Sequence, residues 1–156
     1  ITVRRAVVVR RPAWEVFTFI ADAENEVLWR PRALYVRKAY RGSLGLGATY
    51  WYVGRRFLGR TTGIIRVTQY EPDKAVTYEG SVDGSMQPED RYVLEPTEGG
   101  TLLVATYQPR LSGLHRLFSS HVFMQLKREM ADSLTRLKRL LEDPAKDAAL
   151  YGSIRD

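Results

Sequence analysis

Residues 120–142 read SHVFMQLKREMADSLTRLKRLLE, and they carry the strongest structural signal in the sequence. At 3.6 residues per turn one face of the segment is entirely apolar, and it carries Phe123, Leu126, Met130, Leu134, Leu137 and Leu141. The opposite face is polar and carries Gln125, Arg128, Asp132, Arg136 and Arg139. The pattern predicts a helix of about 34 Å, at roughly 1.5 Å per residue, which must cover an equally long apolar surface. We expect a β-sheet to supply that surface.

Seven short runs before this helix are typical of strands. The first, Val3 to Val9, is rich in valine. Six more alternate with a period of two and lie near residues 34–40, 48–56, 60–70, 74–81, 90–95 and 101–108. Turn sequences such as Glu71-Pro72-Asp73-Lys74 separate them, and short loops between successive strands predict antiparallel neighbours.

Two short helices are expected between the first and second strands. Pro12 suits a first helical turn, and helical spacing of apolar residues continues through Asp22. A second helix or turn covers residues 24–29, and Pro31 ends it because its ring removes a backbone donor.

The predicted element order is β-α-α-β6-α, which indicates an α+β fold. We expect a seven-stranded, curved antiparallel sheet wrapped around the long C-terminal helix. A curved sheet and a single long helix leave a space that side chains do not easily fill, so this layout predicts an apolar ligand cavity. Residues 1–143 are expected to form one ligand-binding domain, followed by a C-terminal tail over residues 144–156.

Length and composition are ordinary for a globular protein, with 156 residues, 44% hydrophobic and 27% charged. Without cysteine the chain has no disulfide framework or thiolate metal site, and no apolar run approaches the ~18 residues of a membrane span.

The net charge of +6 is spread over scattered basic pairs such as Arg4-Arg5, so no nucleic-acid partner is expected. We expect a cytoplasmic location, and because the sequence begins at Ile1 rather than Met, an upstream leader is left open.

Four local motifs carry a family resemblance. Residues 11–22 read RPAWEVFTFIAD, residues 29–31 read WRP, residues 67–72 read VTQYEP and residues 94–101 read LEPTEGGT. In this order the motifs resemble those of the START-like helix-grip (SRPBCC) superfamily, in its polyketide cyclase/dehydratase and coenzyme Q-binding-like branch. The resemblance implies a helix-grip fold, but it does not choose a reaction, because the superfamily includes both binding proteins and enzymes.

The candidate ligand-binding side chains lie on the expected inner face of the sheet, on the second helix and on the apolar face of the long helix: Trp29, Tyr50, Tyr52, Val67, Tyr78, Tyr92, Phe123, Leu126, Met130 and Leu134. Alternation allows either Tyr50 with Tyr52 or Trp51 with Val53 to face inward. Nine tyrosines and three tryptophans suit aromatic cavity walls and a polycyclic or phenolic ligand. The alternative is that these aromatics only fill the core or cover the outer face of the sheet, and that Trp29 plugs the space between the second helix and the sheet.

Few residues are suited to acid–base chemistry. Tyr78, Tyr92 and Arg91 are the catalytic candidates, although alternation points Arg91 away from the side that bears Tyr92. His115 and His121 are the only histidines, and they lie before or at the start of the long helix. The sequence therefore indicates no metal site, no cofactor and no arrangement of nucleophile, histidine and acid.

The leading interpretation is a protein that binds a small hydrophobic or aromatic molecule, such as a lipid, a quinone or a polyketide-like compound, between the sheet and the long helix. The alternative is a polyketide cyclase, aromatase or dehydratase that orients a poly-β-ketone chain there, since orientation can supply much of such a rate. Chaperone-activator-like roles and transient contact with a membrane surface are minor alternatives. The sequence leaves the ligand, the existence of an enzymatic activity and the oligomeric state open.

Overall fold

The sheet has seven antiparallel strands in the spatial order β1-β7-β6-β5-β4-β3-β2. Their bounds are β1 (Val3–Val9), β2 (Ala33–Lys38), β3 (Thr49–Arg56), β4 (Gly59–Glu71), β5 (Ala75–Val82), β6 (Glu89–Thr97) and β7 (Gly100–Gln108). Strands β2 to β7 form a meander, and β1 pairs with β7 to complete the sheet. The predicted seven-stranded antiparallel sheet is therefore confirmed.

The computed structural model describes residues 1–56, 59–84, 86–110 and 119–143. The tail expected over residues 144–156 lies outside the described residues, and so does His115. Within the described part of the chain, no helix is long and apolar enough to cross a membrane.

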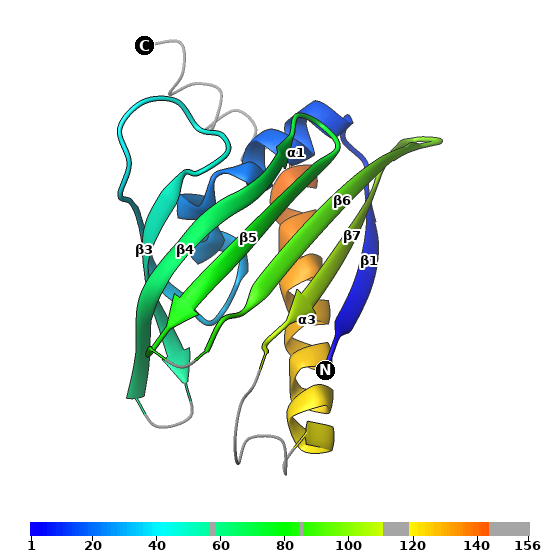
Figure 1. Ribbon diagram of the computed structural model, residues 1–156. Helices are drawn as coiled ribbons and strands as arrows, with labels where there is room; N and C mark the ends of the chain where they lie inside the picture. The colour runs from blue at the N-terminus through cyan, green and yellow to red at the C-terminus, as the bar shows by residue number, and fades with distance from the viewer. Residues whose placement is uncertain (57–58, 85, 111–118, 144–156) are drawn as a thin grey trace.

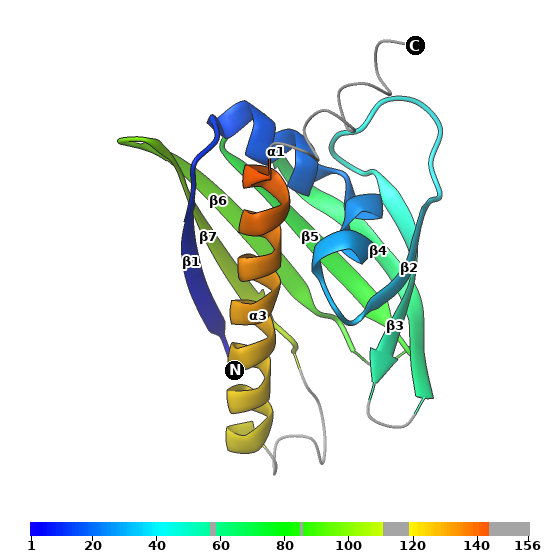
Figure 2. The ribbon, with the colours of Figure 1, turned by 180° about the vertical axis from the view of Figure 1, so that it is seen from behind.

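The helices all lie on one face of the sheet (Figures 1 and 2). They are α1 (Ala13–Ala21), the 3₁₀ helix η1 (Ala23–Asn25), α2 (Glu26–Trp29) and α3 (Ser119–Glu142). The Asp22 side chain accepts a hydrogen bond from the backbone N–H of Glu24 at 3.1 Å, which starts η1 directly after α1. This tight connection folds the chain back, so that α2 lies close to α3 on the same face of the sheet.

The long helix α3 packs along β1 (Figure 2). Of its predicted apolar face, Leu134, Leu137 and Leu141 are buried, whereas Phe123, Leu126 and Met130 are half-buried. Its C-terminal half is fixed to β1 by hydrogen bonds. Lys138 Nζ donates to the carbonyl oxygen of Val8 at 2.6 Å, and the backbone N–H of Arg10 donates to Glu142 Oε1 at 2.7 Å. The N-terminal half is packed less closely, and the prediction of an amphipathic helix at the C-terminal end of the fold is confirmed.

The strand register resolves the alternative at β3. Tyr50 is completely buried, whereas Trp51 is 55% exposed on the outer face, so Tyr50 and Tyr52 face the helices. Val67, Tyr78 and Tyr92, which were expected on the inner face, are also buried. The same holds for further side chains of strands β2 and β4 to β7: Val36, Ile65, Val76, Leu94, Leu103 and Ala105. Most of the hydrophobic core therefore lies between the concave face of the sheet and the three helices α1, α2 and α3.

Candidate functional site

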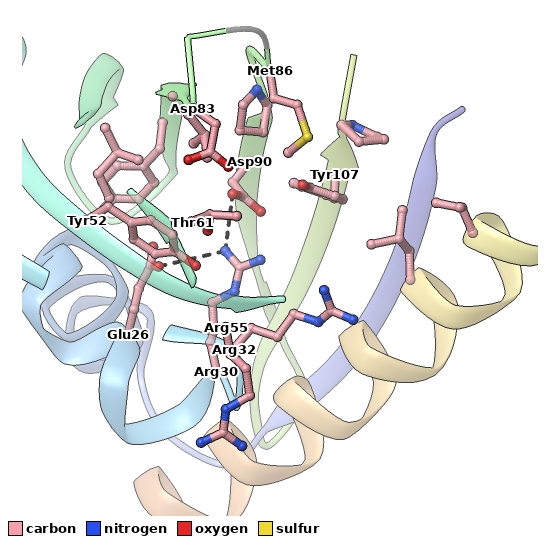
Figure 3. Close-up of a pocket in the computed structure, with 18 residues that line it drawn as sticks. Glu26, Arg30, Arg32, Tyr52, Arg55, Thr61, Asp83, Met86, Asp90 and Tyr107 are labelled. Carbon is pink, nitrogen blue, oxygen red and sulfur yellow. Dashed lines mark ion pairs between the residues drawn. The ribbon is translucent and has the colours of Figure 1, made fainter. Parts of the chain in front are cut away.

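Two adjoining cavities lie between the sheet and α3 within the described part of the structure. The larger, of about 340 Å³, is shown in Figure 3, and the smaller has about 280 Å³. Both are lined by Arg30, Arg32, Tyr52, Arg55, Tyr107 and Leu126. Because they share these walls, the two cavities form one hollow whose sides come from the sheet, from α2 and from α3.

Seven of the ten predicted ligand-binding residues line this hollow: Trp29, Tyr52, Tyr78, Tyr92, Leu126, Met130 and Leu134. The other three do not. Tyr50 and Val67 are fully buried in the core, where the Tyr50 ring meets the Tyr40 ring edge to face at 5.5 Å. Phe123 is half-buried on α3, with the Lys127 ammonium 5.2 Å from its ring centroid.

The catalytic candidates occupy different sides of the sheet. Tyr78 lines the larger cavity and Tyr92 the smaller. Arg91 is exposed on the opposite face and lines neither cavity, because alternation along β6 turns it away from Tyr92.

A charged cluster of Glu26, Arg30 and Asp90 lines the larger cavity (Figure 3). Arg30 Nη1 lies 3.1 Å from Asp90 Oδ2 and 3.8 Å from Glu26 Oε2, and it also donates a hydrogen bond to the Tyr92 hydroxyl at 3.3 Å. The Arg30 guanidinium lies 5.8 Å from the Trp29 ring centroid. Arg30 is thus held by two carboxylates, a phenol and an aromatic face.

Glu26 is the most unusual member of this cluster, because this acidic residue, at the start of the four-residue helix α2, is only 4% exposed. Burial raises its pKa to about 7, against the lowering effect of Arg30 and with a further rise from Asp90. Among the described residues it accepts no side-chain hydrogen bond, and Arg30 is its ion-pair partner. A carboxyl with this pKa can gain or lose a proton close to neutral pH.

Sequence reasoning missed this cluster, although two signals were present. Glu26 and Arg30 are four residues apart, a spacing that places both on one side of a helix. Asp90 precedes Tyr92 by two residues, so the alternation that turns Tyr92 inward also turns Asp90 inward. Neither signal shows that the two elements meet, because α2 and β6 are far apart along the chain.

The tyrosines supply hydroxyl groups to the same hollow. Tyr78 donates a hydrogen bond to the Ile20 carbonyl oxygen at 2.7 Å, and the Tyr92 ring meets that of Tyr78 edge to face at 6.3 Å. Burial raises the pKa of Tyr52 to about 12 and that of Tyr78, Tyr92 and Tyr107 above the ordinary phenol value. All four phenols are therefore neutral near pH 7.

Two further features mark the edge of the hollow. Arg32, just after α2, forms an ion pair with Glu129 of α3, and both line the smaller cavity. Trp29 is buried and its indole N–H has no hydrogen-bond partner among the described residues. The described residues also contain no group of three or more His, Cys, Asp or Glu side chains suited to hold a metal ion.

The comparisons with known proteins agree with this architecture. Residues 1–142 match the family described as polyketide cyclase / dehydrase and lipid transport, and the chain belongs to that family. No curated protein matches the sequence.

Solved structures show the same fold at low sequence identity. TTHA0849 from Thermus thermophilus has a TM-score of 0.76 at 15% identity, over 90% of this chain and 97% of that one. The Aha1 dimer from Colwellia psychrerythraea has a TM-score of 0.63 at 16% identity, over 92% and 97%. DynU16, a protein in the dynemicin biosynthetic locus, has a TM-score of 0.64 at 21% identity, over 91% of this chain and 47% of DynU16.

Proposed function

We propose that the protein binds a small hydrophobic or aromatic molecule, such as a lipid, a quinone or a polyketide-like compound, in the hollow between the sheet and α3. The observation that carries this proposal is the pair of adjoining cavities, of about 340 and 280 Å³, within the fold. Ligand pockets of proteins commonly measure roughly 300–1,000 Å³ and are mostly apolar with a few convergent polar groups. Burying about 200 Å² of apolar ligand surface would contribute about 5 kcal/mol before ordering costs, which makes micromolar affinity reasonable.

A fluorescence titration with 8-anilinonaphthalene-1-sulfonate tests the location of binding. Leu126 lines both cavities, so Leu126→Trp should fill part of the hollow and weaken probe binding about tenfold or more. Met124→Trp on the same helix is the matched control, because Met124 is 52% exposed and should tolerate the change without loss of affinity. Equal probe affinity for both variants and the unchanged protein would refute binding in the hollow.

A second candidate function is the cyclisation or dehydration of a poly-β-ketone chain. It is favoured by the charged cluster, because Glu26 has a pKa of about 7 and lies beside the Arg30 guanidinium within the hollow. A carboxyl of this kind is suited to general acid–base work, while the surrounding walls would orient the chain. The place of DynU16 in a biosynthetic locus, together with the cyclase and dehydrase description of the family, supports the same direction.

Turnover of a short poly-β-ketone surrogate tests this second function. Tyr92→Phe removes the hydroxyl that receives the Arg30 hydrogen bond, and we expect it to lower turnover about tenfold. Tyr35→Phe makes the same chemical change at a residue that is 47% exposed and should leave turnover intact. No turnover above the uncatalysed rate by the unchanged protein would leave only the binding function.

A further inference from the structure

Arg30 is shared unequally between its two carboxylates. Its Nη1 atom lies within hydrogen-bond distance of Asp90 at 3.1 Å, and it donates to the Tyr92 hydroxyl at 3.3 Å. Glu26 Oε2 is 3.8 Å away, which is too long for a hydrogen bond. The close contacts of Arg30 Nη1 are therefore with Asp90 and Tyr92, and Glu26 receives the charge of Arg30 without a hydrogen bond from it.

The groups that face Glu26 from the neighbouring elements do not satisfy it either. These groups are Arg30 beside α2, Tyr52 of β3, Tyr78 of β5, and Asp90 and Tyr92 of β6. The Tyr78 hydroxyl donates to the Ile20 carbonyl oxygen, and Asp90 can only repel a second carboxylate. In the described part of the chain, no side chain donates a hydrogen bond to Glu26.

An almost buried carboxylate without a hydrogen-bond donor is costly, and it lines the larger cavity, where a bound molecule can reach it (Figure 3). A ligand that offers a hydrogen-bond donor at this point would remove that cost. Charges of both signs line this cavity, with the carboxylates of Glu26, Asp83 and Asp90 among the guanidinium groups of Arg30, Arg32 and Arg55, so a ligand ion of either sign that contacts Glu26 also meets groups of its own sign. A neutral hydroxyl avoids both kinds of repulsion.

We propose that Glu26 recognises a hydroxyl of the bound molecule, either a phenol or the enol of a β-dicarbonyl, by accepting its hydrogen bond. This inference rests on the proposed function, because it requires a ligand in the hollow. The aromatic rings of Tyr52, Tyr78 and Tyr107 line the same cavity and suit the ring or conjugated chain that carries such a hydroxyl. Glu26 thereby selects oxygenated ligands from a pool of equally apolar ones.

The inference has a pH dependence with a definite sign. An ionised carboxylate accepts a hydrogen bond about twice as strongly as a neutral group does. As the pH rises through about 7, Glu26 ionises and the bond from a neutral hydroxyl strengthens. A ligand without a hydroxyl gains nothing from this ionisation.

The matched probes 2-naphthol and 2-methylnaphthalene test the inference, because they differ only in a hydroxyl in place of a methyl group. Calorimetric titration of the unchanged protein should show a ratio of affinities, naphthol over methylnaphthalene, that rises several-fold between about pH 6 and pH 8, where a phenol is still neutral. Glu26→Gln should lower this ratio about tenfold at pH 8 and remove its pH dependence. Glu79→Gln is the matched control, because Glu79 is exposed on β5, next in sequence to the inward-facing Tyr78. This variant should preserve both the affinity ratio and its pH dependence.

The outcomes separate this inference from the function on which it rests. Probes that bind, and that Leu126→Trp excludes, but whose affinity ratio is the same in Glu26→Gln and the unchanged protein, would overturn the role of Glu26 and leave the binding function intact. Failure of both probes to bind would overturn both proposals. If Glu26→Gln does not fold, a flat affinity ratio from pH 6 to pH 8 in the unchanged protein overturns the inference, and a rising ratio supports it.

Discussion

At the level of single residues, Glu26 combines an unfavourable burial of a carboxyl group with a pKa suited to chemistry at the site. The residue is 4% exposed, and its pKa is raised from an ordinary value near 4.5 to about 7, chiefly by burial. The folded protein therefore holds the Glu26 proton more tightly than the unfolded chain does. Between pH 4.5 and 7 the folded state binds more protons at this residue, so stability must fall as the pH rises through this range.

We accordingly predict that Glu26→Gln becomes stabilising relative to the unchanged protein as the pH is raised. The difference in unfolding free energy should grow by on the order of 3 kcal/mol between about pH 4.5 and pH 7 and then level off. Urea denaturation at several pH values measures it. The same series for Glu79→Gln should show no such trend. If the difference in unfolding free energy from the unchanged protein depended on pH in the same way for both variants, the buried state of Glu26 would be contradicted.

At the scale of elements, α3 has two halves with different neighbours. Leu137 is completely buried, in the half that is hydrogen-bonded to β1, whereas Met130 is half-buried and lines the smaller cavity. The helix therefore forms a wall of the hollow as far as Leu134, in its second half, and the residues from Leu137 to Glu142 anchor the helix.

This division predicts different costs for two truncations on one helix. Leu137→Ala should lower the unfolding free energy by about 3 kcal/mol, because it opens a new cavity in packed surroundings. Met130→Ala should cost about 1 kcal/mol or less, because the side chain already borders empty space, while it should change probe affinity more than Leu137→Ala does. Equal stability losses would show that both halves are packed alike.

Strands β4 and β5 approach each other closely at Gly63. A Cβ atom at Gly63 would lie 2.2 Å from the Ser81 carbonyl oxygen and 2.9 Å from the Val82 Cα, so the backbone itself would have to move. We predict that Gly63→Ala lowers the unfolding free energy by about 2–4 kcal/mol in urea denaturation. Gly45→Ala, at a glycine with no heavy atom within 4 Å of such a Cβ, should change it by less than about 0.5 kcal/mol.

At the scale of the whole molecule, the two layers are joined at both sides of the hollow. The C-terminal end of α3 is fixed to β1 and the residues after it, where Arg11 Nε donates to the Leu141 carbonyl oxygen at 2.9 Å. On the other side, Arg32 and Glu129 form an ion pair across the smaller cavity. The hollow is thus bordered on one side by the hydrogen-bonded contact between α3 and β1. On the other side it is bordered by a partly exposed ion pair.

We predict that Glu129→Gln affects ligand exchange more than stability. Partly exposed ion pairs contribute about 0–1 kcal/mol to folding, so the unfolding free energy should change little. Release of 8-anilinonaphthalene-1-sulfonate, followed by stopped-flow fluorescence, should become about threefold faster, since the contact across the cavity is lost. Glu95→Gln, on the exposed side of β6, is the control and should leave the release rate unchanged.

The sequence alone was enough to predict the order of the elements, the inward direction of Val67, Tyr78 and Tyr92, and the apolar face of α3. These features are local, because an alternation of two or a spacing of three to four residues decides which side chains share a face. The sequence also identified seven of the residues that line the hollow, the first of them Trp29 and the last Leu134. Tyr50 and Val67 face inward as expected but lie in the packed core, because periodicity gives a direction and not the amount of space beyond it.

Only the tertiary structure decided the chemical character of the site. Glu26 and Arg30 come from the α2 region and Asp90 from β6, and they meet because the fold brings the end of α2 within reach of the start of β6. No local pattern encodes a contact between segments about sixty residues apart along the chain. The burial that raises the pKa of Glu26 has the same origin, since desolvation depends on every element that surrounds the carboxyl and not on its neighbours in sequence.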